Sequence, residues 1–344
     1  MKRKFVWLFP LTICLALCPA AFGTWGSFIS TGTNTGIGIP SCAQVSSGLV
    51  ACAMRSGTSV MMVNQFNGTK WGTKWTNLAG AVRSDPSCTS DGAGNVICGA
   101  TATNGNLQVS TFNGTVWSTP VKIKAALYSA PSCAEYLAGQ VLCAARNSTG
   151  GLAYTVFNGT TWSAIANVAT TATSQPSCTT DNNSGVICAV FTTGSATLVN
   201  RYAAGAWQGF LNIGGTASSQ PDCTSLNSAG KVVCFAEGYN SGIYGALYNG
   251  GAWVASQWNA YFGISGMVTE NASCASQAAG QLVCGIIATD SAFYGDVYNG
   301  SSWAGWVKVG GTGVAIPACA PLSAGQVVCL VVGTDNKLTS VVGP

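Results

Sequence analysis

Cysteine is the residue type whose number and spacing in this chain most directly suggest chemistry. The sequence has 344 residues, 16 cysteines and no histidine. Without histidine the Ser-His-Asp and Cys-His nucleophile systems cannot be built, and most zinc and copper sites lose their commonest ligand. Three roles remain for the cysteines: they can form disulfides, bind a metal through thiolates, or lie in the core as free thiols.

Fourteen of the cysteines form seven pairs that recur every 45 to 51 residues, six separated by 10 positions and one by 11. A turn midway between such cysteines places them opposite each other on adjacent antiparallel strands, within disulfide reach. Zinc ligands are more closely spaced, with roughly two to four residues between them. We therefore predict seven local disulfides: Cys42–Cys52, Cys88–Cys98, Cys133–Cys143, Cys178–Cys188, Cys223–Cys234, Cys274–Cys284 and Cys319–Cys329.

The carboxylates give little support to catalysis. The ten acids are scattered and form no repeated or paired motif, whereas a glycosidase needs two carboxylates at a defined separation. We predict no catalytic residue, no metal site and no cofactor. A glycan-active hydrolase or lyase that uses acids such as Glu237 and Asp296 is the weaker alternative.

Aromatic side chains are better candidates for binding, because their faces stack on sugars. One Trp stands at the same place in every repeat, which favours packing between repeats, but a second aromatic three to five residues later varies. Another variable position, three residues after the second cysteine, carries charge in a chain with only 7% charged residues. A solvated surface role is the alternative for both positions. The predicted sugar-binding residues are Trp75, Phe210, Trp258, Trp306, Arg55, Arg146 and Glu237.

The third repeat shows the elements that position these residues. Short strands are expected over residues 131–134, 141–145 and 152–157, and Trp162 opens a fourth. Asn158-Gly159 between the last two indicates a type I′ hairpin turn, in which both central residues need φ > 0. A period of about 45 residues with four strands is typical of a β-propeller blade. Abundant glycine and period-two alternation exclude helical repeats.

The two chain ends complete one repeat between them. The last repeat stops after a strand over residues 337–342 and lacks its Trp strand, whereas residues 25–30 form a Trp strand with no repeat of their own. In a ring the N-terminal strand would complete the last blade and remove two open sheet edges. The sequence therefore predicts an all-β, seven-bladed β-propeller with four-stranded blades and one disulfide within each blade.

Residues 1–23 have the features of a signal peptide, with a basic start, an apolar run and small residues before Thr24. The propeller is then expected over residues 24–344, secreted to an extracellular or periplasmic compartment and without a membrane span. Removal of the segment takes three of the 14 basic residues and none of the 10 acids, which leaves a net charge of about +1. So small a charge argues against nucleic acid and anionic membranes as partners.

Residues 303–311 (WAGWVKVGG) and 207–215 (WQGFLNIGG), followed by Pro317 and Pro221, resemble the repeat of bacterial seven-bladed propeller lectins that bind fucose and O-methylated sugars. The six-bladed fungal fucose lectins are a more distant likeness. The resemblance implies several equivalent sugar sites between neighbouring blades. In the fungal group an arginine and an acid about a dozen residues later bind the sugar together. Arg55 and Arg146 have no acid at that distance here, and Asn67 and Asn158 stand there instead.

Together these observations predict a multivalent lectin whose partners are glycans, fucosylated or methylated ones among them. Several weak sites on one rigid ring would raise avidity. A protein-binding or adhesion propeller without sugar specificity is the alternative, and association with a second copy of the chain stays open.

Overall fold

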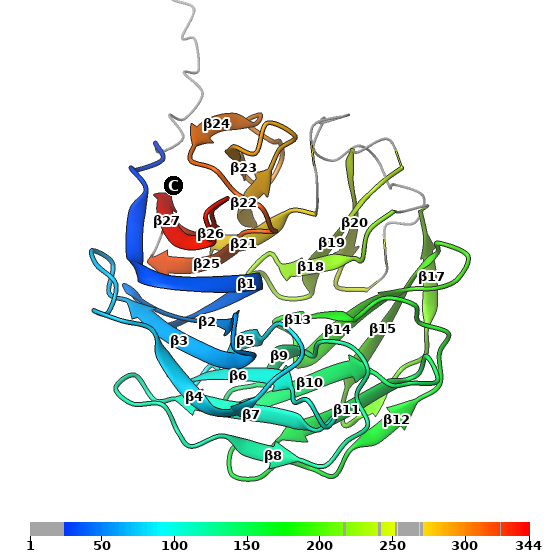
Figure 1. Ribbon diagram of the computed structural model, residues 1–344. Coiled ribbons are helices and arrows are strands. Elements are labelled where there is room, and N and C mark those ends of the chain that lie inside the picture. Colours follow the sequence, from blue (N-terminus) through cyan, green and yellow to red (C-terminus); the bar gives the residue numbers. More distant parts are fainter. Residues whose placement is uncertain are drawn as a thin grey trace, which may run out of the picture.

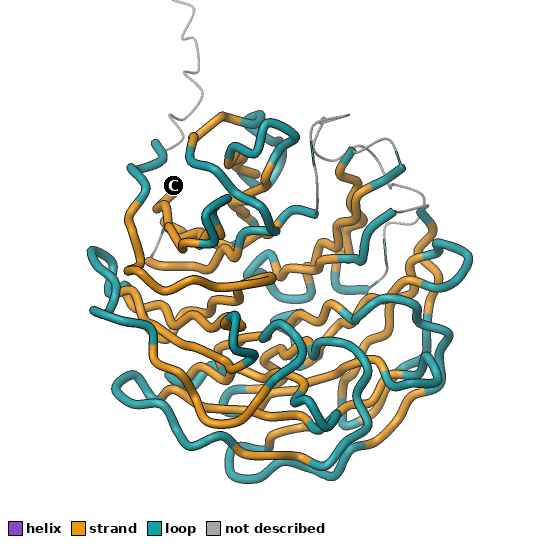
Figure 2. The backbone as a smooth tube through the Cα atoms, viewed as in Figure 1, coloured by secondary structure: helices purple, strands orange, loops and turns teal. Residues whose placement is uncertain are grey.

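The computed structural model describes residues 24–215, 218–239, 242–251, 253, 268, 271–323 and 325–344, and every regular element among them is a β-strand (Figures 1 and 2). The fold is an all-β propeller, as predicted. The expected signal peptide lies outside the described residues. No helix in the described ranges is long and apolar enough to cross a membrane.

The strands form six hydrogen-bonded sheets in the described part of the chain. The largest sheet, in spatial order, contains β25 (Ala318–Ser323), β26 (Gln326–Val332), β27 (Lys337–Gly343), β1 (Ile29–Ser46), β2 (Leu49–Ser56), β3 (Val60–Phe66) and β4 (Thr76–Ala81). The next two are β5 (Ser87–Ser90), β6 (Val96–Thr101), β7 (Leu107–Phe112) and β8 (Val121–Ile123), then β9 (Ser132–Leu137), β10 (Gln140–Arg146), β11 (Leu152–Phe157) and β12 (Ala166–Val168).

The remaining three sheets follow in chain order. They are β13 (Ser177–Thr180), β14 (Gly185–Phe191), β15 (Thr197–Ala203), β16 (Ala206–Trp207) and β17 (Leu211–Gly214); β18 (Asp222–Ser225), β19 (Lys231–Glu237) and β20 (Ile243–Asn249); and β21 (Ser273–Ala278), β22 (Gln281–Ile287), β23 (Phe293–Tyr298) and β24 (Val307–Gly310).

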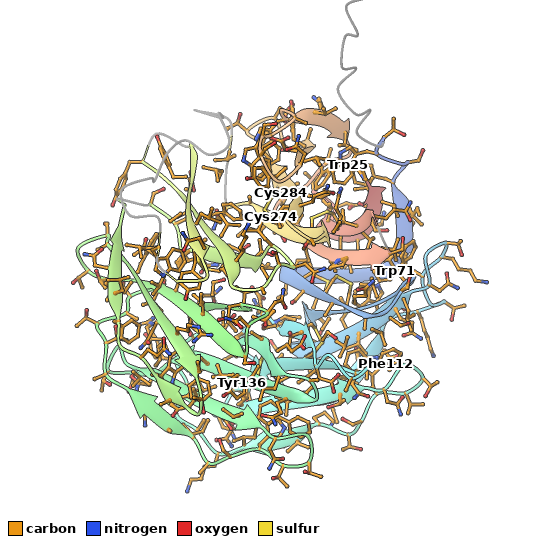
Figure 3. All side chains as sticks on the ribbon, turned by 180° about the vertical axis from the view of Figure 1, so that it is seen from behind. Trp25, Trp71, Phe112, Tyr136, Cys274 and Cys284 are labelled. Carbon is orange, nitrogen blue, oxygen red and sulfur yellow. A yellow bond between two sulfur atoms is a disulfide. The ribbon has the colours of Figure 1, made fainter. Side chains whose placement is uncertain are left out.

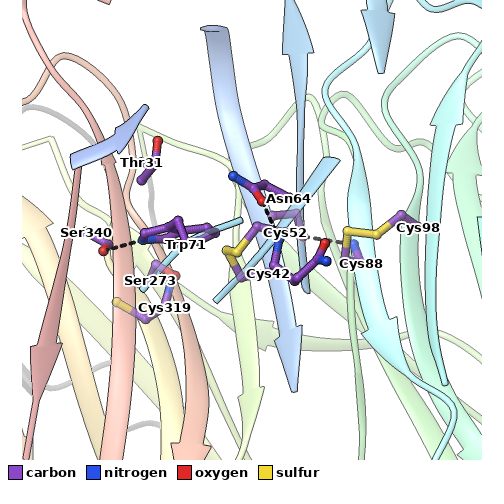
Figure 4. The surroundings of a disulfide bond; sticks show 12 residues. Thr31, Cys42, Cys52, Asn64, Trp71, Cys88, Cys98, Ser273, Cys319 and Ser340 are labelled. Carbon is purple, nitrogen blue, oxygen red and sulfur yellow. Dashed lines mark hydrogen bonds between the residues drawn. A yellow bond between two sulfur atoms is a disulfide. The ribbon is translucent and has the colours of Figure 1, made fainter. Parts of the chain in front are cut away.

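All seven predicted disulfides are present, each between the first two strands of a repeat. Figure 3 labels Cys274 and Cys284, and Figure 4 shows the bridges Cys42–Cys52 and Cys88–Cys98. The register explains them, because the two cysteines of every pair are direct cross-strand partners, as Cys42 and Cys52 are. We number the seven disulfide hairpins, with the strands that follow each, as units 1 to 7. The inner strand of each unit contacts that of the next, in the closed order β1, β5, β9, β13, β18, β21, β25 and back to β1.

The N-terminal segment pairs with the C-terminal strand, as predicted. Ile29 lies opposite Ser340 on β27, and the Gly26 N–H donates to the Val342 carbonyl at 2.8 Å. Strand β1 then continues and pairs with β2, so units 7 and 1 share one seven-stranded sheet. In Figure 1 β1 runs beside β25 and β27 at one end and toward β2 at the other.

Two sets of hydrogen bonds tie neighbouring units together near the ring axis. The first joins the main-chain N–H of a unit's first cysteine to the serine hydroxyl one residue before the first cysteine of the previous unit. These bonds, 2.8 to 3.1 Å long, link Cys88 to Ser41, Cys133 to Ser87, Cys178 to Ser132, Cys223 to Ser177 and Cys319 to Ser273.

The second set runs between turn glycines and carbonyls of the previous unit. Gly139 N–H donates to the Asp91 carbonyl, and Gly48 N–H donates to the Leu322 carbonyl, both at 2.6 Å. These glycines have φ of 78° and 81°, a conformation that residues with a Cβ adopt at a cost. The repeated turn glycine therefore lets each hairpin hold its neighbour.

The Asn-Gly turns differ from the type I′ prediction. In the third unit four residues separate the bridged pair Phe157 and Trp162, and the Asn158 N–H donates to the Thr161 carbonyl. Only Gly159 has φ > 0, whereas the Asn158 side chain accepts the main-chain N–H groups of Thr160 and Thr161. The prediction of two left-handed residues was wrong, because the asparagine serves as a hydrogen-bond acceptor in a wider loop.

Candidate functional site

The repeated Trp of each unit is a packing residue. In units 1 and 3, for example, it lies beside the aromatic ring across the wide loop, with ring centroids 5.3 Å apart for Phe66 and Trp71 and 5.2 Å for Phe157 and Trp162. Trp71 also packs among Leu338 and other residues of unit 7, and its Nε1–H donates to Ser340 Oγ at 2.8 Å (Figure 4). This confirms the interpretation that the first Trp packs units against each other.

Trp75 does not offer the exposed ring predicted for a sugar platform. Its side chain is 4% exposed, stacks on Trp71 at 5.9 Å and donates from Nε1 to Thr31 Oγ1 at 3.1 Å. The ring fills the space between units 1 and 7, so Trp75 belongs to the core. An aromatic side chain at the variable position can therefore serve packing alone, without a role in ligand binding.

Phe210 and Trp306, two further predicted aromatics, lie at junctions between units. Phe210 is partly buried against Leu152 and Val190, and Trp306 is partly buried against a cluster that includes Phe235. Trp258 lies outside the described residues. Phe210 and Trp306 therefore remain candidates for sugar contact at two different junctions.

The predicted charged residues contact linkers between units: Arg55 meets the linker that leads to the next unit, whereas Arg146 and Glu237 meet the linker from the preceding unit. Arg55 Nε donates to Asp85 Oδ1 at 3.2 Å, and the Arg146 guanidinium carbon lies 4.8 Å from the centre of the Tyr128 ring. The Glu237 main-chain N–H donates to Ser219 Oγ at 3.1 Å. Because these three residues belong to different units, the structure does not bring them into one site.

A groove between units 4 and 5 combines aromatic, apolar and amide groups in one place. Its volume is about 690 Å³, and it lies between β15–β17 on one side and residues of unit 5 on the other. Tyr248 and Trp253, with ring centroids 5.4 Å apart, form the aromatic wall. Its other described lining residues are Ile187, Val199, Asn200, Arg201, Gln208, Gly209, Leu211, Asn212, Ile213, Gly214, Gly215 and Gly251.

Asn200 lines the groove and carries a buried hydrogen-bond donor that no described residue accepts. The side chain is 2% exposed and its Oδ1 accepts the Gly209 N–H at 3.0 Å, but Nδ2 finds no acceptor among the described residues. The equivalent Asn64 of unit 1 instead donates from Nδ2 to the Gly72 carbonyl at 3.2 Å. A buried donor without a partner costs free energy, which a ligand oxygen can recover.

The one cation in the described lining of the groove is already neutralised. Arg201 Nε donates to Asp181 Oδ2 at 2.6 Å, its Nη2 donates to the Asn183 carbonyl at 2.9 Å, and Asp181 is fully buried. Gln208 and Asn212 are exposed amides on the same wall. The described lining therefore suits a neutral ligand that combines an apolar face with hydroxyl groups.

The sequence interpretation missed Asn200, Tyr248 and Trp253 as groove residues, although Trp253 was noted as a repeat Trp. A signal was present for Asn200. The residue 12 positions after each second cysteine lies opposite it on the third strand and is polar in most units: Asn64, Ser110, Thr155, Asn200, Ala246, Asp296 and Val341.

Two acids of the described chain, Asp296 and Asp222, have a pKa raised to about 6. Burial raises the pKa of Asp296 from 3.8 to about 6, against hydrogen bonds from the Val297, Gly305 and Ala304 N–H groups that lower it. Burial likewise raises the pKa of Asp222 to about 6, opposed by hydrogen bonds from Ser177 and the Cys223 N–H. Within the described ranges no three His, Cys, Asp or Glu side chains gather to hold a metal ion.

No family model and no curated protein matches the chain. Solved structures of similar fold include the BP39L lectin from Burkholderia pseudomallei, at 15% identity and a TM-score of 0.73, covering 90% of this chain and 96% of the lectin. The six-bladed fucose-recognising lectin of Aleuria aurantia has 14% identity and a TM-score of 0.56, covering 81% and 98%. AofleA from Arthrobotrys oligospora has 12% identity and a TM-score of 0.57, covering 84% and 93%.

Proposed function

We propose that this protein is a secreted carbohydrate-binding protein, a lectin, that holds neutral sugars in grooves between adjacent units of its propeller. The groove between units 4 and 5 carries the proposal, because a buried amide donor without a partner lies beside an aromatic wall. Sugars present C–H faces to aromatic rings and hydroxyl oxygens to amide donors, so the two features together match their chemistry. Propeller lectins among the structural neighbours agree with this assignment.

We further propose that each disulfide unit is one blade, which makes a seven-bladed ring. In this interpretation the seven-stranded sheet is two blades joined through β1, and the N-terminal strand completes the last blade. The closed order of seven inner strands supports the count. The six-bladed lectin covers a smaller share of this chain than BP39L does, as expected if one blade has no counterpart there.

Other junctions are proposed as further sugar sites. Phe210 and Trp306 would supply aromatic faces at two of them, and Arg55, Arg146 and Glu237 would supply polar contacts at the linker ends. Trp258, outside the described residues, stays a proposal of the same kind. Fucosylated and methylated glycans are the first ligands to test, because Aleuria aurantia lectin recognises fucose.

A glycan array followed by calorimetric titration with the best monosaccharide tests the proposal. We expect Asn200→Ala and Gln208→Ala to weaken binding about tenfold each, the loss expected for one to two hydrogen bonds. Asn64→Ala is the matched control, because it occupies the same strand position in unit 1 away from the groove. Absence of binding across a broad array, or equal affinity of all three variants and the parent at the groove, would contradict the assignment.

Binding of a protein partner is the second candidate. Tyr128 and Tyr239 are 60% and 72% exposed, and Tyr239 Oη lies 3.0 Å from Ser195 Oγ in the neighbouring unit. Exposed tyrosines are common anchors of protein interfaces. Pull-down of a partner that free sugars do not displace, and that Tyr239→Ser weakens, would favour this function.

A further inference from the structure

The ring axis contains a second cavity, separate from the groove between units. Its volume is about 800 Å³, and residues of the inner strand of every unit line it. The described lining is mostly neutral and polar, with hydroxyl or amide groups from Gln44, Ser90, Thr180, Ser225 and Ser276 among others. No lysine or arginine is among the described lining residues.

Glu135 is the one charged residue in that described lining. It lies on β9, two residues after Cys133, and is partly buried. No hydrogen bond or ion pair to its carboxylate occurs within the described part of the chain. The neighbouring Gly92 leaves the carboxylate its space, because a Cβ there would overlap Oε1.

A comparison with unit 1 explains why this carboxylate has no partner. Gln44 occupies the equivalent position and donates from Nε2 to the Leu322 carbonyl at 2.8 Å, beside the Gly48 N–H that donates to the same oxygen. In unit 3 the matching carbonyl of Asp91 accepts the Gly139 N–H at 2.6 Å. An ionised Glu135 has no proton to donate to that oxygen. Its carboxylate therefore lines the cavity without a hydrogen-bond partner among the described residues.

The neighbouring carboxylate of Asp91 has its own hydrogen-bond donors and shares none with Glu135. The Asp91 side chain is 3% exposed and accepts hydrogen bonds from the N–H groups of Ala93 and Asn95 and from Asn95 Nδ2, at 2.7 to 2.9 Å. Burial, and secondly the charge of Asp91, raise the pKa of Glu135 above its usual value. A ligand that brings a positive charge would relieve both effects.

We propose that the axial cavity binds a small hydroxylated primary amine of the amino-sugar class, with its ammonium group on the Glu135 carboxylate and its hydroxyls on the neutral polar lining. The ammonium group supplies the donors that Glu135 lacks, and a charge-assisted hydrogen bond of this kind is stronger than a neutral one. The hydroxyls match serine, threonine and amide groups, each of which both donates and accepts. This site is independent of the proposed sugar site between units 4 and 5.

Titration of the whole protein with glucosamine, glucose and N-acetylglucosamine tests the proposal, because the three share a ring and differ in charge. We expect glucosamine to bind at least about tenfold more tightly than the two neutral sugars at the axial site, the gain of one charge-assisted hydrogen bond. Affinity should rise with pH as Glu135 loses its proton, up to the pH at which the amine is deprotonated. Equal affinities of glucosamine and glucose in the parent protein would overturn the proposal without any variant.

Glu135→Gln is the decisive variant and is expected to fold, because its amide can donate to the Asp91 carbonyl as Gln44 does to that of Leu322. It should remove the preference for glucosamine over glucose. Asp290→Asn changes the net charge equally at an exposed acid paired with Lys308 and should leave the preference intact. An unchanged preference in Glu135→Gln would contradict the proposal.

The two proposals can fail separately. Asn200→Ala should weaken glycan binding at the groove and leave glucosamine binding unchanged, and Glu135→Gln should do the reverse. Loss of glucosamine binding in Asn200→Ala, with Glu135→Gln unaffected, would place the amine in the groove and refute the axial site.

Discussion

Five of the junctions between units carry the serine-to-cysteine hydrogen bond, and two do not. At the junction of units 5 and 6 Asp222 stands in place of the serine, and at the closing junction of units 7 and 1 Ala318 does. At the closing junction the pairing of β1 with β27 and the Gln44 Nε2 bond to the Leu322 carbonyl are added to the turn-glycine bond from Gly48 that other junctions also have. The ring thus closes through main-chain pairing where the repeated side-chain contact is absent.

The largest effect should come from removing the closing strand. Deletion of residues 24–30 exposes the edge of β27 and removes Trp25 and Phe28, whose rings lie 5.3 and 6.2 Å from that of Phe293. The loss of two large aromatic side chains from a packed site should cost more than about 3 kcal/mol. Chemical denaturation measures this loss, with exposed Ser27→Ala as the control. A deletion variant as stable as the parent would show that residues 24–30 do not help to close the ring.

Removal of one disulfide should cost about 2–3 kcal/mol, because each bridge closes a loop of about 10 residues in the unfolded chain. We expect Cys42→Ser/Cys52→Ser at the closing junction and Cys178→Ser/Cys188→Ser at a serine junction to be equally destabilised, since both pairs are 10 residues apart. Denaturation of both variants in parallel checks this. A difference above about 1 kcal/mol would mean that the bridges also set the junction geometry.

The Asp222 junction should weaken as the pH rises. The pKa of Asp222 is raised from 3.8 to about 6, so the folded chain holds the proton more tightly than the unfolded chain does. The stabilisation from that proton is complete below pH of about 4 and is lost as the pH rises through about 6, a change of about 1–3 kcal/mol. Melting curves from pH 4 to 7 should show this fall, and Asp222→Ser should reduce it. Asp296→Asn should further reduce this loss of stability with rising pH, because the pKa of Asp296 is raised to about 6 as well.

The smallest effect should come from adding the missing hydroxyl. Ala318→Ser at the closing junction is expected to gain about 0.5–1.5 kcal/mol by accepting the Cys42 N–H, and Ser41→Ala should lose a similar amount by freeing the Cys88 N–H. Thermal unfolding of the two variants measures both changes. Destabilisation by Ala318→Ser would show that the closing junction has no room for the contact.

The propeller could be predicted from the sequence because each repeat is defined locally. Cysteines 10 apart fix the register of one hairpin, and this register recurs in every unit. Even closure could be predicted, since Trp25 stands as far before Cys42 as Trp71 stands before Cys88. The binding residues were harder to find because they depend on contacts between units. Trp75 stands four residues after its repeat Trp and Phe210 three residues after its own, but Thr31 and Trp71 enclose only Trp75.

Asn200 illustrates the same limit. Its amide matters because Nδ2 finds no acceptor, whereas Asn64 finds the Gly72 carbonyl, and nothing in either strand's sequence distinguishes the two. Glu135 likewise becomes a candidate only once the lining of the axial cavity and the position of the Asp91 carbonyl are known.

The confinement of each sulfur bridge to one hairpin has a consequence for biogenesis. Every pair of thiols is brought together by a turn of the chain itself, so oxidation can proceed hairpin by hairpin, in any order, before the two termini meet. Correct partners are also nearest neighbours along the chain, which disfavours scrambled isomers without a dedicated isomerase. Such local bridges suit the proposed export, because disulfides form and persist in oxidising compartments.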